Sequence, residues 1–81
     1  MVVFVESAFR HGYLEDDFFE VLETGPLKLR SRRGLKGIYE LYGRNYTGEY
    51  LHIAYRRDGN QEVVFHMREM RPREKRRYRK L

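Results

Sequence analysis

Three histidines, His11, His52 and His66, are the side chains in this 81-residue sequence best suited to acid–base chemistry. An imidazole with an ordinary pKa of about 6.5 exchanges protons close to neutral pH. His66 and Arg68 are two residues apart, so both side chains share one face if this segment is a β-strand. We take them as the leading pair, in which the guanidinium holds a phosphate and the imidazole moves a proton. His52 is a spare imidazole, His11 before Gly12 is expected to cap a turn or pack, and a plain surface role is the alternative for each.

These residue types could cleave RNA without a metal. The reaction requires that the 2′-hydroxyl loses a proton, that the charge of the phosphorane is stabilised and that the leaving 5′-oxygen gains a proton. Imidazole, phenol, carboxylate, ammonium and guanidinium groups can share these roles, and the sequence contains all of them. It has no cysteine, no HxH or HxxxH spacing and no Walker or Rossmann glycine pattern. We therefore expect neither a metal nor a cofactor.

The charges are strongly segregated along the chain. The net charge is +5, but residues 1–27 hold one basic and six acidic residues, whereas residues 28–81 hold sixteen basic and six acidic ones. Eight of the seventeen Lys and Arg residues lie between Arg68 and Leu81. A basic surface of this kind attracts polyanions, of which nucleic acid is the most common, and the binding weakens with salt. The alternative is a charged tail that only keeps the protein in solution.

A β-hairpin over Tyr50 to Arg68 is the clearest element, with Asp58-Gly59-Asn60 as its turn. Alternation predicts a core face and a polar face, because successive side chains of a strand point to opposite sides. The core face is expected to hold Leu51, Ile53, Tyr55, Val63, Phe65 and Met67. The polar face is expected to hold His52, Ala54, Arg56, Val64, His66 and Arg68.

The other segments complete an α+β domain that spans residues 1–81 as one unit. We expect an edge strand at 2–5, a short helix or turn at 6–12, an acidic helix at 14–24 and a basic helix at 72–80 that begins with Pro72. Strands at 27–32 and 36–44 would join the hairpin in an antiparallel sheet of three to four strands. The acidic helix would cover one face of the sheet, and the basic helix would lie beside the other.

The polar face of this sheet is predicted to be cationic and to bind RNA. Cationic groups there would neutralise phosphates, and aromatic or imidazole rings would stack on unpaired bases. A one-residue slip in any strand would move its side chains to the other face. The residues assigned to this surface are Lys28, Arg30, Arg32, Tyr42, Arg44, His52, Arg56, His66 and Arg68.

The order of several motifs resembles the BrnT family of bacterial toxins. The motifs are Arg10-His11-Gly12, then Leu41-Tyr42-Gly43-Arg44, then the strand from Leu51 to Arg57, then Val64-Phe65-His66-Met67-Arg68 and finally Arg73-Glu74-Lys75-Arg76-Arg77-Tyr78. They span roughly residues 9 to 79. The sequence departs from the family's Ser-Ala-Arg pattern, because His66 replaces the serine and Met67 the alanine. Glu49 replaces an arginine at the start of the third strand, and an acidic-His-Ser loop is shortened to Ser31-Arg32-Arg33.

The resemblance implies a type II toxin with a RelE-like fold that cleaves RNA without a metal, inhibits translation and is silenced by a cognate antitoxin. It implies functional roles for Arg44, Arg57, Arg68, Glu74, Arg76 and Tyr78. Combined with the analysis above, the predicted catalytic residues are His66, Arg68, Arg44 and Tyr78. The predicted RNA-binding residues are Arg30, Arg32, His52, Arg56, Arg57 and Arg76.

The expected partners are RNA and the antitoxin, with no membrane, and assembly as a homo-oligomer or with the antitoxin stays open. The N-terminal residues lack the basic start of a signal peptide, and no run of about 18 apolar residues occurs, so a cytoplasmic location is expected. Two alternatives to a ribonuclease remain. One is a non-catalytic module that binds nucleic acid, and the other is an interaction domain whose basic helix docks on an acidic partner.

Overall fold

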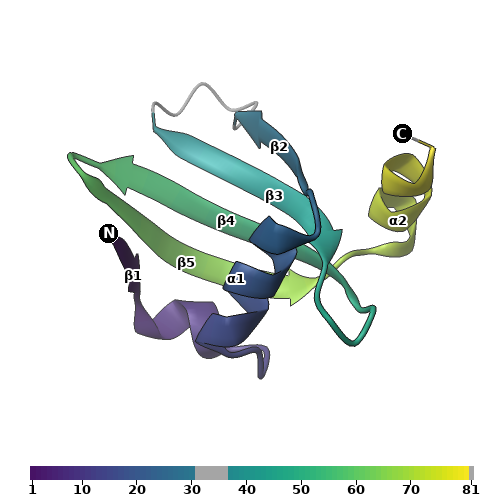
Figure 1. Ribbon diagram of the computed structural model, residues 1–81, viewed down its shortest axis with the longest axis horizontal. Helices are drawn as coiled ribbons and strands as arrows, with labels where there is room; N and C mark the ends of the chain where they lie inside the picture. The colour runs from purple at the N-terminus through teal and green to yellow at the C-terminus, as the bar shows by residue number, and fades with distance from the viewer. Residues whose placement is uncertain (31–36, 81) are drawn as a thin grey trace.

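The computed structural model describes residues 1–30 and 37–80, which form a five-stranded sheet with helices (Figure 1). The strand order is β1-β5-β4-β3-β2, with β1 parallel to β5 and every other pair antiparallel. The predicted α+β class is confirmed, but the expected antiparallel sheet of three to four strands is instead a mixed sheet of five, because β1 joins its edge in parallel to β5. The elements are β1 (Val2–Phe4), a 3-10 helix η1 (Glu6–Phe9), α1 (Glu15–Glu23), β2 (Leu27–Arg30), β3 (Ile38–Arg44), β4 (Tyr50–Asp58), β5 (Gln61–Glu69) and α2 (Pro72–Arg79).

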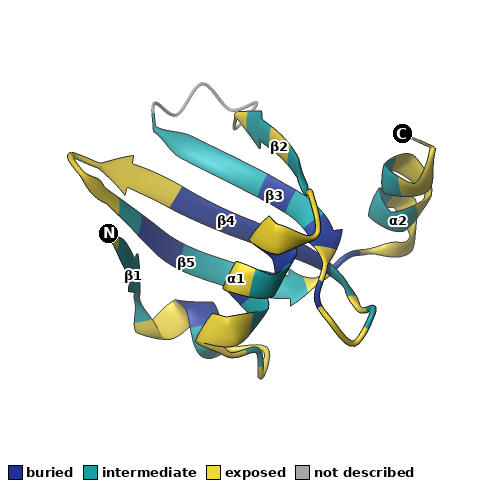
Figure 2. Cartoon of the chain, viewed as in Figure 1, coloured by how far each residue is buried: buried dark blue, intermediate teal, exposed yellow. Residues whose placement is uncertain are grey.

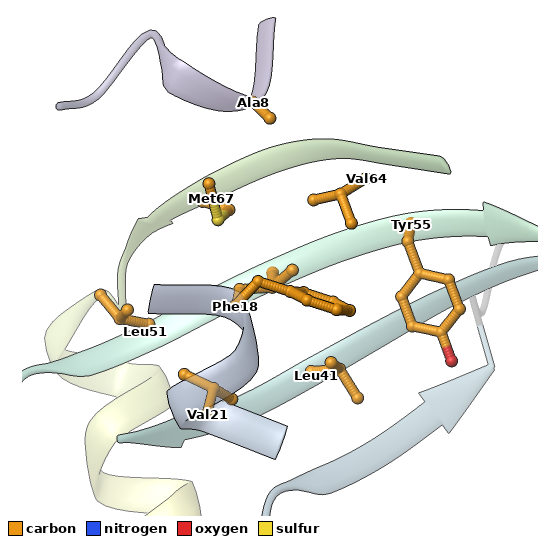
Figure 3. Close-up of a cluster of buried hydrophobic side chains, with 9 residues drawn as sticks. Ala8, Phe18, Val21, Leu41, Leu51, Tyr55, Val64 and Met67 are labelled. Carbon is orange, nitrogen blue, oxygen red and sulfur yellow. The ribbon is translucent and has the colours of Figure 1, made fainter. Parts of the chain in front are cut away.

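Helix α1 covers one face of the sheet and forms the core with it (Figure 3). Its Phe18 and Val21 are fully buried, as their helical spacing predicts. Three acidic residues lie in its first turn, where the helix dipole favours them, and the Asp17 carboxylate accepts a 2.8 Å hydrogen bond from the Leu14 backbone N–H. The sheet contributes Leu41, Leu51, Ile53, Tyr55, Val64 and Met67 to this core.

A β-bulge in β5 changes which of its side chains enter the core. Ala54 pairs with His66 and Tyr55 pairs with Val64, so Phe65 is an extra residue with no partner in β4. Because one extra residue inverts the alternation, Val64 is fully buried in the core while Val63 pairs with Arg56 on the opposite face. The prediction that placed Phe65 in the core and Val64 on the polar face is therefore wrong. Val63 is buried as predicted, with 5% of its surface exposed, but it lies on the face opposite α1. Met67, His66 and Arg68 keep their predicted faces.

The register of β2 also differs from the prediction. Lys28 pairs with the core residue Leu41, and Arg30 pairs with Tyr39. Paired residues share a face, so both basic side chains lie on the α1 side of the sheet. The Lys28 ammonium accordingly lies 5.0 Å from the ring centroid of Tyr39. Arg30 is thus not part of the polar face, and Arg32 lies outside the described residues.

Figure 2 shows that the buried residues run through the middle of β3, β4 and β5, whereas α2 contains no buried residue. The polar face opposite α1 is therefore less covered, and α2 contacts only one end of it through Arg68 and Tyr50. Among the described residues, no helix combines the length and the apolar character needed to cross a membrane.

Candidate functional site

The three histidines and Tyr42 form a continuous row of rings on the polar face. Tyr42 of β3 stacks on His52 of β4 with ring centroids 4.6 Å apart. The edge of His52 meets His66 of β5 at 5.4 Å, and His66 meets His11 at 5.8 Å. His11 lies in the turn that follows η1, and Gly12 makes this turn possible by adopting a φ of 88°. The row therefore joins three neighbouring strands to a loop that is remote in sequence.

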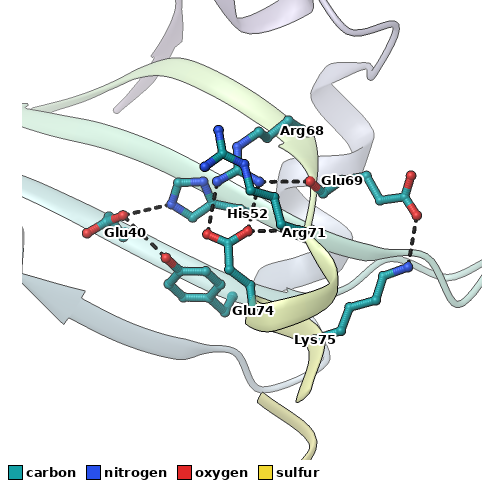
Figure 4. Close-up of polar contacts among 8 residues, drawn as sticks. Glu40, His52, Arg68, Glu69, Arg71, Glu74 and Lys75 are labelled. Atoms are coloured by element: carbon teal, nitrogen blue, oxygen red, sulfur yellow. Dashed lines mark hydrogen bonds and ion pairs between the residues drawn. The ribbon is translucent and has the colours of Figure 1, made fainter. Parts of the chain in front are cut away.

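His52 is the buried member of the row, with 7% of its surface exposed. Its Nε2 lies 2.8 Å from the Glu40 carboxylate (Figure 4), and in neutral His52 the N–H at that nitrogen donates a hydrogen bond to the carboxylate. Burial lowers the pKa of His52, although Glu40 opposes this effect. Within the described residues Nδ1 is buried without a partner, so His52 carries a bare nitrogen inside the site.

His66 is half-buried and is the imidazole closest to both of the others. Burial lowers its pKa to about 4, and the neighbouring His52, Arg68 and His11 act in the same direction. It is therefore neutral at pH 7 and can accept a proton. A phosphate bound beside it would add negative charge and raise this pKa towards neutrality, which would make it a stronger base.

Arg68 is held by a carboxylate rather than free to meet a ligand. Its two terminal nitrogens donate to the two oxygens of Glu74 at 2.8 and 2.9 Å, and its side chain is 17% exposed. Glu74 also accepts a 2.8 Å hydrogen bond from the Arg71 backbone N–H at the start of α2. These bonds hold the pKa of Glu74 at about 2, mainly through Arg68. We predicted that this guanidinium holds a phosphate, but in the structure Glu74 occupies the two-point contact that suits a phosphate.

Tyr42 adds a phenol that keeps its proton. Its hydroxyl donates to Glu40 Oε1 over 3.4 Å. Burial raises its pKa to about 12, with Glu40 and Glu74 contributing and Arg68 opposing. Glu40 therefore ties Tyr42 and His52 together, and the predicted uniformly cationic face is interleaved with two carboxylates.

A second group of side chains surrounds Tyr50 at the α2 end of this face. Arg44 and Arg79 have their guanidinium carbons 5.0 and 5.6 Å from the ring centroid, and the Lys75 ammonium lies at 5.9 Å. The ring of Tyr78 meets Tyr50 edge-on at 5.9 Å. Two predicted catalytic residues, Arg44 and Tyr78, thus lie together around Tyr50 rather than in the histidine row.

The remaining predicted RNA-binding residues are dispersed. Arg56 is exposed on the polar face, one same-face position beyond Ala54 towards the hairpin turn. Arg57 alternates with it and lies on the other face. Arg76 is exposed on α2.

Sequence reasoning did not identify Glu40 and His11 as parts of the site, and it named Glu74 only through the family resemblance, without its partner Arg68. Glu40 could have been found, because alternation along β3 puts it on the same face as Tyr42. Glu74 is the third residue of a helix that begins with Pro72, a position where a carboxylate reaches back to the backbone. No local signal places His11 against His66, since the contact depends on how η1 packs beside β5.

Among residues 1–30 and 37–80, no group of three His, Cys, Asp or Glu side chains could hold a metal ion. Comparisons with protein-family models, curated proteins and solved structures found no match.

Proposed function

We propose that this protein is a metal-independent endoribonuclease and the toxin of a type II toxin-antitoxin system. The proposal includes a RelE-like fold, a cytoplasmic location, inhibition of translation by RNA cleavage, and a cognate antitoxin that covers the polar face. The observation that carries it is the pair of imidazoles, His11 and neutral His66, whose rings are 5.8 Å apart on the polar face. Two imidazoles at this separation could contact the same phosphodiester.

In this mechanism neutral His66 takes the proton of the 2′-hydroxyl, and the 2′-oxygen forms a bond to phosphorus. The bond from phosphorus to the 5′-oxygen breaks, and His11, which is exposed, protonates that oxygen. Arg68 gives up its hydrogen bonds to Glu74, donates to the phosphorane oxygens instead and stabilises their charge. The products are a 2′,3′-cyclic phosphate and a 5′-hydroxyl. Glu40 and Tyr42 hold His52, which packs against His66 and orients it.

The test is incubation of single-stranded RNA with purified protein in EDTA. His66→Gln and His11→Ala should each lower the cleavage rate by about a hundredfold or more, which is the usual contribution of a general acid or base. Arg30→Ala removes a charge on the α1 side and is the matched control, which should cleave as wild type does. Thermal unfolding of each variant checks that its fold is retained.

Induced expression provides a cellular test of the toxin assignment. Wild type should arrest growth, His66→Gln should not, and co-expression of a small protein from the adjacent reading frame should restore growth. Intact RNA together with normal growth would refute the proposal.

A non-catalytic module that binds nucleic acid is the second candidate. It is favoured by the ion pair that occupies Arg68 and by the pKa of His66 at about 4, which makes that imidazole a weak base at neutral pH. Rings such as Tyr42 and Tyr50 could still stack on bases without any chemistry. Salt-dependent binding of RNA by wild type, with no cleavage, would select this candidate.

A further inference from the structure

The cations around Tyr50 come from two elements that meet only in the folded protein. Arg44 ends β3 and pairs directly with Tyr50 in β4, whereas Lys75 and Arg79 belong to α2. All three cationic groups lie within 5.9 Å of the centroid of one ring. The ring attracts each of them, but like charges so close together repel one another.

This cluster carries more positive charge than the nearby carboxylates offset. Lys75 pairs with Glu69 at 3.0 Å. Over the residues that the structure describes, neither Arg44 nor Arg79 takes part in an ion pair, and both are exposed. Two guanidiniums beside one aromatic ring can both donate to the same phosphate, and its charge would relieve their repulsion.

The frame that holds these side chains is well fixed. The Arg44 carbonyl accepts a 2.6 Å hydrogen bond from the Thr24 hydroxyl, which ties the end of β3 to the end of α1. The Tyr50 carbonyl accepts a 2.9 Å hydrogen bond from the Met70 N–H, and α2 is anchored through Glu74 and Arg68. The two guanidiniums are therefore carried by supported elements, which favours a site of defined geometry.

The position of the cluster separates it from the proposed reaction. His66 pairs with Ala54 in β4, and Tyr50 lies four residues before Ala54 on the same face. At the usual rise of a strand this is about 13 Å. An RNA strand that crosses the face could reach both places, but with different phosphates.

We propose that Arg44 and Arg79 bind one backbone phosphate of single-stranded RNA across the ring of Tyr50, at a subsite distinct from the one where cleavage occurs. This inference rests on the proposed function, and it assigns Arg44 and Tyr78 to substrate binding instead of the catalytic roles that the family resemblance implied. Both guanidinium carbons lie within 5.6 Å of the centroid of the Tyr50 ring, and Tyr78 meets that ring edge-on. The subsite contributes to affinity and not to the chemical step.

The test measures binding separately from cleavage. A fluorescent 2′-O-methyl RNA oligonucleotide cannot be cut through its 2′-oxygen, and its anisotropy reports Kd over a series of salt concentrations. The double variant Arg44→Ala/Arg79→Ala should raise Kd by about tenfold or more. The slope of log K against log salt should become shallower by about 0.7, as expected for one lost phosphate contact with a single strand.

Three further variants sharpen the result. Tyr50→Phe keeps the ring and should bind as wild type does, whereas Tyr50→Leu should weaken binding. Arg30→Ala removes another exposed charge, from the other face, and should leave Kd and slope unchanged. With cleavable RNA, the double variant should raise KM while kcat stays within about twofold of wild type, because the reacting groups are untouched.

The possible failures are distinct. Failure of wild type to bind the oligonucleotide, or an unchanged Kd and slope in the double variant, would overturn the subsite. Loss of kcat with Kd unchanged would also overturn it, because Arg44 or Arg79 would then act in the reaction. Wild type that binds through these residues but leaves ordinary RNA intact would support the subsite and refute only the ribonuclease.

Discussion

Replacing Glu74 by glutamine tests whether the bond between α2 and β5 stabilises the protein. Glu74 accepts two hydrogen bonds from Arg68 and one from the Arg71 backbone, and its pKa falls from 4.5 to about 2. Glutamine keeps the shape and one oxygen acceptor but removes the charge. Arg68 would then be left partly buried beside an uncharged amide.

The size of the effect follows from the lowered pKa. At about 1.36 kcal/mol for each pKa unit, the full change would exceed about 3 kcal/mol. The Glu74 side chain is 22% exposed, and solvent screens the pair, so we expect a loss of about 1–2 kcal/mol in the free energy of unfolding. For a domain of this size that corresponds to a melting temperature lower by roughly 5–15 °C.

The assay is thermal unfolding followed by circular dichroism, with Glu69→Gln as the control. Glu69 pairs with Lys75, but its side chain is 61% exposed, so its loss should cost less than about 0.5 kcal/mol. Because the pKa of Glu74 is lowered by folding, its stabilisation is present above about pH 4.5 and disappears as the pH falls to about 2. The difference between wild type and Glu74→Gln should disappear over the same range. Equal melting temperatures for the two variants at pH 7 would refute the reasoning.

Three other predictions follow from the described contacts. NMR titration of His66 should give a pKa of about 4 in the folded protein. Because the pKa in the unfolded chain is about 6.5, this group makes the free energy of unfolding rise from pH 4 to 6.5. A pKa near 6.5 in the folded protein would contradict the described burial of His66. Gly43→Ala should lower the free energy of unfolding by about 1–3 kcal/mol in urea, because a Cβ there would lie 2.9 Å from Val21 and 3.2 Å from Pro26; unchanged stability would mean that α1 packs further from β3. Glu74→Gln, although less stable, should bind 2′-O-methyl RNA more tightly than wild type because Arg68 is released, whereas weaker binding would show that Glu74 does not compete with phosphate.

The elements with strong local signals could be predicted from the sequence. Helix α1 has apolar spacing, an acidic first turn and Gly25 after its end, and α2 has Pro72 as its first residue. The hairpin has alternation on both sides of Gly59, which adopts a φ of 62° in its turn. In each case the residues that fix the element are neighbours in the chain.

The errors arise where distant segments decide the outcome. No residue type near Phe65 marks it as the extra residue of a bulge. The bulge depends on how β5 pairs with both β4 and β1. The register of β2 is set by pairing with β3 across a connection outside the described residues, so Lys28 and Arg30 were assigned to the wrong face.

The chemistry of the site was predicted only in part. His52, His66 and Arg68 share a face because strand alternation determines it. The pairing of Arg68 with Glu74 and the contact between His11 and His66 depend on where α2 and η1 pack. Long-range contacts of this kind place two paired carboxylates and a neutral His66 on a surface that was predicted to be cationic.

The most direct test of the central claim is mass spectrometry of the ends of RNA fragments produced in EDTA. The claim is that His66 and His11 act on one phosphodiester. Wild type should yield 2′,3′-cyclic phosphate and 5′-hydroxyl ends, and a substrate with a single 2′-deoxy nucleotide at the cleavage site should stay intact there. Fragments that carry 5′-phosphate ends, or RNA that remains uncut by wild type, would contradict it.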